Sequence, residues 1–112
     1  MSKTIFCDID GCLIEHQNYY TEDAKILDGT KEKLKDWDRK GYRLILTTGR
    51  RESARAVTEK MLHKNNITYD YLIMGLGPNV RVLINDLRDG EDIDTAVSIN
   101  LPRNVGIKNL DL

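Results

Sequence analysis

Residues 5–11, with the sequence IFCDIDG, join an apolar run to two carboxylates and a glycine. Side chains on a strand alternate between its two faces, so Asp8 and Asp10 share one face. Gly11 allows a sharp turn, which places the acidic pair at the end of the strand. Close carboxylates repel unless a cation lies between them or one holds a proton, and both arrangements can serve catalysis. A solvated Asp-x-Asp-Gly turn would explain the tetrapeptide equally well, so features further along the chain must decide.

The length and charge of the chain limit its class. Its 112 residues suffice for one domain with one core, which we expect to span residues 1–112. The formal net charge of −1, from 17 basic and 18 acidic side chains, provides no general field for attracting nucleic acid or an anionic membrane. No apolar run reaches the length of a membrane span, and residues 1–4 lack the apolar core of a signal peptide. We therefore expect a cytoplasmic location without membrane contact.

The two cysteines lie on either side of the acidic pair. Without an export signal, Cys7 and Cys12 are expected to be reduced thiols, a disulfide between them being the alternative. A Cys-x4-Cys pair with no second Cys or His pair does not make a zinc site. Cys7 is therefore interpreted as a small apolar residue of the first strand.

Alternating strand and helix patterns predict an α/β domain. This alternation favours right-handed crossovers and a small Rossmann-like three-layer sandwich with a mostly parallel sheet. Leu34 and Trp37 share one face of an expected helix that ends at Gly41. The expected strands cover residues 4–8, 43–48, 71–74, 80–85 and 96–99, and the expected helices cover residues 30–40 and 52–64. A polar flap is expected over residues 15–28, and residues 102–112 are expected to close an edge of the sheet. The connection over residues 75–79 looks too short for a full crossover helix.

Polar clusters follow three of the expected strands. They are Asp8 with Asp10, residues 47–50 (TTGR), and Asn85 with Asp86. In an open α/β sheet, ligands bind beyond the carboxyl ends of the strands, which is where all three clusters fall. Three independent solvated turns would not require this coincidence.

This set of motifs resembles the haloacid dehalogenase (HAD) superfamily of phosphotransferases. The first motif of that family is an apolar strand that runs into Asp-x-Asp-Gly, here residues 8–11. The second is a strand ending in Thr or Ser, matched by residues 44–50, and the fourth is a strand ending in acid, matched by residues 82–86. The motifs keep the family's order over residues 4 to about 90, which is more specific than any one of them.

The resemblance implies a Mg²⁺-dependent phosphomonoesterase. Asp8 would be the nucleophile that becomes an aspartyl phosphate, and Asp10 the acid and base for the leaving oxygen and water. Thr48 would hold a phosphoryl oxygen. Asp86, Asp8 and the backbone carbonyl of Asp10 would bind the metal, in keeping with the preference of Mg²⁺ for hard oxygen ligands.

Further residues at the same edge are candidates for substrate contact. The backbones of Gly11 and Gly49 allow N–H groups to approach phosphate oxygens closely. The third-motif Lys of the family is missing from residues 75–79, and its role is left open. Arg81 is the nearest basic residue before the expected fourth strand, or equally a charge on the face of that strand, and Arg50 is expected to contact the substrate. Asp89 is either a second support for the metal water or a plain loop acid. The other departures from the family are Asn85-Asp86 in place of Asp-Asp, and Cys12 in place of Thr.

The sequence leaves no room for a cap domain after either of the first two motifs. Capless members of the superfamily tend to act on large substrates or to take a lid from a neighbouring subunit, because an open site excludes water poorly. Two arrangements follow equally: a homo-oligomer in which Arg51 or Lys64 is donated in trans, or a monomer whose own Arg81 reaches the phosphate. The flap contributes His16, Tyr19 and Tyr20 as rim residues, and the apolar cluster of Tyr69, Tyr71, Leu72, Met74 and Leu76 is the expected contact surface.

Three functions are compatible with these features. The first is hydrolysis of a small phosphorylated substrate such as a sugar phosphate. The second is a polynucleotide end phosphatase, against which one Trp, five Tyr and a balanced charge offer no basic, aromatic track for a strand. The third is a non-catalytic HAD-like module that binds metal or a phospholigand, which the missing Lys favours and the intact acidic pair disfavours.

Overall fold

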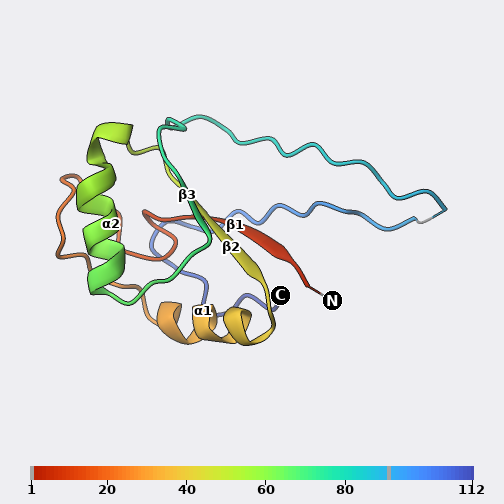
Figure 1. The fold of residues 1–112 in the computed structure, drawn as a ribbon, viewed down its shortest axis with the longest axis horizontal. Coiled ribbons are helices and arrows are strands. Elements are labelled where there is room, and N and C mark those ends of the chain that lie inside the picture. The colour runs from red at the N-terminus through yellow and green to blue at the C-terminus, as the bar shows by residue number, and fades with distance from the viewer. Residues whose placement is uncertain (1, 91) are drawn as a thin grey trace.

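A three-stranded parallel sheet organises the computed structural model, which describes residues 2–90 and 92–112 (Figure 1). The expected α/β class, with a parallel sheet and no cap, is confirmed. The sheet has the order β1-β2-β3. Its elements along the chain are β1 (Thr4–Asp8), α1 (Thr30–Arg39), β2 (Arg43–Thr47), the short 3-10 helix η1 (Glu52–Ala54), α2 (Arg55–Lys64) and β3 (Tyr71–Ile73).

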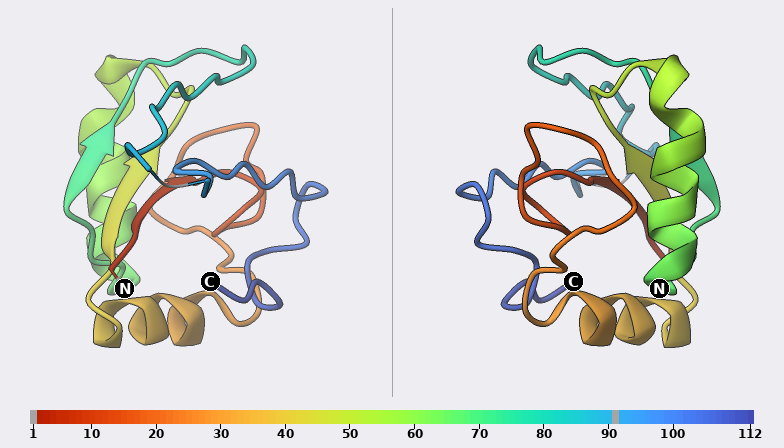
Figure 2. Two further views of the ribbon diagram at one scale, coloured as in Figure 1. Left: turned by 90° about the vertical axis from the view of Figure 1, so that its right-hand side faces the viewer. Right: turned by 90° about the vertical axis from the view of Figure 1, so that its left-hand side faces the viewer.

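The register of the sheet brings the strand ends level with one another. β1 pairs with β2 from Thr4↔Arg43 to Asp8↔Thr47, and β2 pairs with β3 up to Thr47↔Ile73. Figure 2 shows α1 lying across the end at which the strands begin, while α2 stands beside the sheet. The carboxyl end of the sheet is therefore left to loops.

The core lies where the first loop meets β2 and α2. Trp37 is the buried anchor of α1, as its helical face predicted. The loop after β1 contributes as much to the core as the strands do, because its apolar side chains are fully enclosed. The residues with at most 1% exposure among the buried apolar side chains are Ile9, Leu13, Ile14, Leu46, Met61, Leu62 and Ile107.

The expected fourth and fifth strands are wrong. Residues 80–85 and 96–99 form no strand pairing in the structure, and residues 78–90 and 92–100 leave the body as an extended loop (Figure 1). Val80 and Ile84 are 90% and 87% exposed. Parallel strands ordinarily need a crossover of a dozen or more residues, and the connection after β3 is shorter than that. The outer edge of β1 consequently has no strand partner among the described residues.

The expected oligomer surface is also wrong in part. Leu72 and Met74 are buried in the core, with 9% and 8% exposure, whereas Tyr71 is 63% exposed. Residues 102–112 form no strand. They close the body beside α1, where Lys33 Nζ donates to the Leu110 carbonyl at 2.6 Å.

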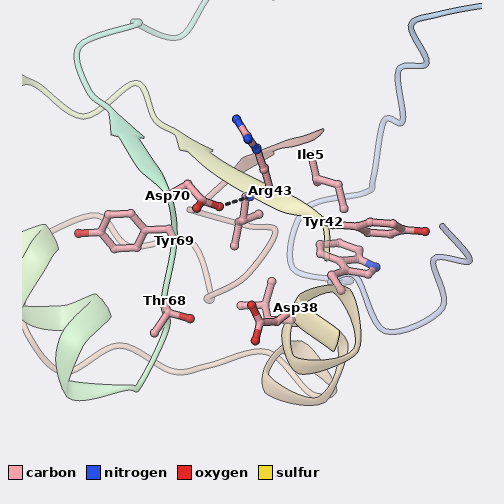
Figure 3. Close-up of a pocket in the computed structure, with 10 residues that line it drawn as sticks. Ile5, Asp38, Tyr42, Arg43, Thr68, Tyr69 and Asp70 are labelled. Carbon is pink, nitrogen blue, oxygen red and sulfur yellow. Dashed lines mark hydrogen bonds between the residues drawn. The ribbon is translucent and has the colours of Figure 1, made fainter. Parts of the chain in front are cut away.

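A cavity of about 170 Å³ lies at the beginning of the strands (Figure 3). Asp70 lines it, but its carboxylate accepts a hydrogen bond from the Leu44 backbone N–H at 2.8 Å, so this acid fixes the approach to β3. The cavity is at the end of the sheet opposite to Asp8 and is not the candidate site. No helix of residues 2–90 or 92–112 has both the length and the apolar character needed to cross a membrane.

The contrast between core and extended loop predicts the effect of truncating leucines. Leu46→Ala removes a fully buried side chain from the central strand and should lower the free energy of unfolding by about 2–5 kcal/mol. Leu87→Ala, at a side chain that is 52% exposed, should change it by no more than about 0.5 kcal/mol. Denaturant unfolding measures both, and equal losses would contradict this placement of the core.

Candidate functional site

The loop after β1 holds the acidic pair at the end of the sheet. The Ile9 carbonyl accepts hydrogen bonds from the backbone N–H groups of residues 12, 13 and 14, at 3.0–3.3 Å. Gly11 has a φ of 82°, a left-handed conformation that favours glycine, and donates its N–H to the Ile14 carbonyl at 2.8 Å. The loop is thus a tight coil anchored by buried isoleucines. Asp8 is exposed at its start, and Asp10 is half-buried.

The loop after β2 lies next to the loop after β1 because Asp8 and Thr47 are paired in register. Thr48 is buried, and its hydroxyl oxygen accepts the Arg50 backbone N–H at 3.1 Å, which leaves the hydroxyl proton free to be donated. A Cβ at Gly49 would lie 2.8 Å from the Gly77 carbonyl oxygen. The absence of a side chain at Gly49 therefore permits close approach of the loop that follows β3.

Arg50 does not open toward solvent as a substrate contact would. Its guanidinium is fully buried and forms a bidentate pair with Asp10, with Nε to Oδ2 at 2.9 Å and Nη2 to Oδ1 at 2.8 Å. Such fork-to-fork pairs are among the strongest hydrogen-bonded ion pairs. The structure thus pairs Arg50 with Asp10, whereas the sequence analysis expected it to contact the substrate.

The metal-binding set expected from the sequence is only partly assembled. Asp8 and Asp10 are together, but Asp86 and Asp89 are exposed on the extended loop of residues 78–90 and 92–100. Within residues 2–90 and 92–112, no group of three or more His, Cys, Asp or Glu side chains gathers to hold a metal ion. The oxygen donors of Asp8 and Asp10 suit Mg²⁺ chemically, but in this arrangement they lack the third acid.

Of the other basic candidates, Arg81 is the one whose charge acts on Asp8. It is exposed, and its positive charge is one of the influences that lower the Asp8 pKa. Lys64 is instead paired with Asp23 at 2.6 Å on the surface of α2. Arg51 is exposed and its backbone carbonyl begins η1. Arg81 therefore remains the cation best placed to approach a ligand of Asp8.

Three residues that the sequence analysis missed complete the site. Thr58 and Gln17 each accept a hydrogen bond from Arg50, at 2.9 and 3.2 Å. Asn104 donates its backbone N–H to the Gly11 carbonyl and accepts the His16 N–H on its side-chain oxygen, both at 2.8 Å. A threonine in the middle of an apolar helix face was an available signal for Thr58. Nothing local marks Gln17 or Asn104.

Burial controls the protonation of the groups around the acidic pair. Desolvation raises the Asp8 pKa above its ordinary value, although the Ile9 backbone N–H and the charges of Arg81 and His16 partly oppose this. Burial also raises the pKa of Cys7 to about 12 and that of Cys12 to about 11, with nearby charges adding to it. Both cysteines are free, as expected, and at neutral pH they are protonated thiols with little nucleophilic character.

A parallel α/β sheet whose first strand ends in Asp-x-Asp-Gly, next to a second ending in Thr-Gly-Arg, defines a HAD-like phosphatase fold. The sequence model of one family, described as "PITM 1-3, LNS2 domain", matches residues 5–82. The chain therefore belongs to this LNS2 family. No curated protein sequence matches the chain.

Solved structures agree with the fold. A chain of a Pnkp1/Rnl/Hen1 complex is similar over 71% of this chain and 30% of its own length, with 31% identity and a TM-score of 0.59. A Pnkp1/Rnl/Hen1 RNA repair complex gives 29% identity over 80% of this chain and 28% of its own, with a TM-score of 0.57. The chain thus spans less than a third of these relatives. A D,D-heptose 1.7-bisphosphate phosphatase from B. bronchiseptica, complexed with magnesium and phosphate, shares the fold at 19% identity, with a TM-score of 0.53 over 69% of this chain and 52% of its own.

The raised pKa of Asp8 predicts how Asp8→Asn affects stability. A carboxyl whose pKa is higher in the folded than in the unfolded chain stabilises the fold when protonated, and this contribution is lost as pH rises through the folded pKa. The uncharged Asn avoids that loss. The melting temperature of Asp8→Asn relative to the natural chain should therefore be higher at pH 7 than at pH 3. Thermal unfolding at the two pH values measures this, and a difference of opposite sign would contradict the desolvated placement of Asp8.

Proposed function

We propose that the chain is a phosphomonoester hydrolase that acts through phosphorylation of Asp8. The observation that carries this proposal is the position of Asp8. It is an exposed carboxylate at the carboxyl end of β1, two residues before a second, partly buried carboxylate and in register with Thr47. Membership of a family with a HAD-like phosphatase fold supports it.

The residues present can divide hydrolysis into two steps. An Asp8 carboxylate oxygen attacks phosphorus, the bond to the leaving oxygen breaks, and Asp10 in its protonated form gives that oxygen its proton. A water then attacks the phosphorus of the acyl phosphate, Asp10 takes a proton from this water, and the bond from Asp8 to phosphorus breaks. Inorganic phosphate leaves with both carboxyls restored. The Thr48 hydroxyl would donate to a phosphoryl oxygen, and Gly11 and Gly49 would offer backbone N–H groups.

Magnesium is the proposed cofactor. Asp8 and the Asp10 carbonyl would hold it, with Asp86 as the third ligand. The ion would neutralise charge on the phosphate. Because Asp86 lies on the extended loop, the complete site requires residues 82–86 to approach β1. We propose that this segment approaches the open edge of β1 without joining the sheet as a regular strand, which would bring Asp86 beside Asp8.

The chain's own segment can make this approach. The position beyond β1 lies three strand spacings from β3, about 14 Å sideways, and about 13 Å back along the strands. Val82 follows Ile73 by nine residues, which span up to about 30 Å when extended. Arg81, just before this segment, already acts on the Asp8 pKa. These facts favour addition within one copy over donation by a second copy, so Arg81 is the proposed phosphate cation.

Two substrate classes fit the proposed reaction. An exposed Asp8 without a cap suits either a small phosphorylated metabolite, such as a sugar phosphate, or a phosphorylated polymer end. The similarity to a chain of an RNA repair complex, at 29% identity, favours a polynucleotide end phosphatase as the second candidate. A non-catalytic module that only binds a phosphoryl ligand is the third possibility, and loss of all turnover would indicate it.

A phosphate-release screen tests the proposal. The panel contains sugar phosphates, nucleotides and phosphorylated oligonucleotides with Mg²⁺. Asp8→Asn should reduce turnover of any accepted substrate at least about 10³-fold, because the amide keeps the shape of the side chain but cannot attack phosphorus. Activity of Asp8→Asn within ten-fold of the natural chain would contradict the nucleophile assignment. If no member of the panel releases phosphate, the result contradicts the hydrolase and supports the non-catalytic module that binds a phosphoryl ligand.

Asp86→Ala should raise the Mg²⁺ concentration for half-maximal activity by about ten-fold or more, since it removes the third acid. Asp89→Ala is the matched control on the same loop and should leave that midpoint unchanged. An unchanged midpoint for Asp86→Ala would place the metal elsewhere.

Mixing the Asp8→Asn and Asp86→Ala variants tests whether residues 82–86 reach Asp8 of the same copy or of a second copy. At a Mg²⁺ concentration that supports the natural chain but not Asp86→Ala, addition within one copy predicts a mixture no more active than Asp86→Ala alone. Recovered activity, together with a dimer by light scattering, would show that a second copy donates it.

A further inference from the structure

Arg50 is the most completely enclosed charged group that the structure describes. Its side chain is fully buried, although it belongs to a loop at the edge of the sheet. Three of its nitrogens donate to Asp10, Thr58 and Gln17, so that four of its five N–H bonds have an acceptor at 2.8–3.2 Å. The ring of Tyr20 lies over the guanidinium, with its centroid 4.1 Å from Cζ. Little of this group remains to bind a substrate.

The residues around Arg50 come from three separate parts of the chain. Asp10 lies on the loop after β1, Thr58 on α2, and Gln17 and Tyr20 on the flap of residues 15–28. Thr58 is itself fully buried. A guanidinium held by a rigid helix on one side, a flap on another and an aromatic ring above has one available orientation. Its bidentate contact transmits that orientation to the Asp10 carboxylate.

Both Asp10 oxygens are fixed by this contact, yet neither is used up. A carboxylate offers about four lone-pair directions, and the pair with Arg50 occupies two of them. The Asp10 side chain keeps 15% exposure, on the same edge of the sheet as Asp8. A reacting oxygen near Asp8 can therefore meet an unoccupied direction of an Asp10 oxygen without displacing Arg50.

We propose that Arg50 is a positioning residue, which holds the Asp10 carboxylate in the orientation for proton transfer at the leaving oxygen and is itself held by Thr58, Gln17 and Tyr20. This rests on the proposed phosphatase function. Lys cannot replace Arg here, because a single ammonium supplies a charge but no planar fork. A proton transfer of this kind typically contributes 10²–10⁴-fold to rate, which gives the size of the effect to be measured.

The test compares two leaving groups in the natural chain and in Arg50→Lys. The rate compared is the saturating first-turnover rate (kcat for release of the leaving group), because the later attack of water on the aspartyl phosphate is common to both substrates and also uses Asp10. For an alkyl phosphate, whose leaving oxygen needs a proton, Arg50→Lys should lower this kcat by about 10²-fold and change KM less than three-fold. For an aryl phosphate with an acidic leaving group, this kcat should fall by less than about ten-fold. Arg51→Lys, at the exposed neighbouring residue, should leave kcat and KM unchanged for both substrates. Asp10→Asn should show the same contrast, and the double variant should be no worse than Asp10→Asn alone.

The outcomes separate this inference from the function it rests on. A raised KM with unchanged kcat would make Arg50 a substrate contact, and equal losses on both leaving groups would make it merely structural; either result overturns the positioning role while leaving Asp8 catalysis intact. Absence of Asp8-dependent turnover in the natural chain would overturn both. If Arg50→Lys fails to fold by circular dichroism, Thr58→Val decides. It removes one acceptor and should produce a smaller loss confined to the alkyl phosphate, and an equal effect on both substrates would overturn the role.

Discussion

The buried pair between the Arg50 guanidinium and the Asp10 carboxylate is the interaction on which the arrangement of the site depends. Burying a charge is costly unless hydrogen-bonding partners surround it. The buried Arg50 guanidinium therefore needs Asp10, Thr58 and Gln17 close by, and all three accept its hydrogen bonds. The convergence ties the loops after β1 and β2 to α2 and to the flap. Without it, the carboxyl end of the sheet would consist of loops connected mainly by backbone contacts.

The parallel register supplies the other half of the geometry. Pairing of Asp8 with Thr47 makes the ends of β1 and β2 level, so Asp8 and Thr48, the proposed phosphate contact, lie where the two loops begin at the same height. The tight coil of residues 9–14 then turns Asp10 toward Arg50 while Asp8 faces solvent. Two carboxylates two residues apart thus have different surroundings, one open to a ligand and one held by a cation. Different surroundings allow different chemical roles.

Local patterns in the sequence predicted the parts of the fold that depend on short-range rules. The acidic pair at the end of β1, the helix anchored by Trp37 and the TTGR ending of β2 all follow from periodicity and turn residues. The partner of Arg50 did not, because Asp10 is 40 positions away and no short-range rule connects them. The strand expected over residues 80–85 shows the opposite failure. Its β-branched residues favour a strand, but the short connection after β3 leaves it extended and exposed.

The most direct test of the central claim, that Asp8 becomes phosphorylated, is to trap the covalent species. The protein is mixed with a substrate identified by the phosphate-release screen, quenched in acid within the first turnover and digested, and the peptides are weighed by mass spectrometry. The account predicts one added phosphoryl group on the peptide that contains Asp8, removed by hydroxylamine as expected for an acyl phosphate. A phosphoryl group on another residue would contradict the account. The Asp10→Asn variant should accumulate the acyl phosphate because its second step is slowed, so turnover by this variant without any trapped species would also contradict it.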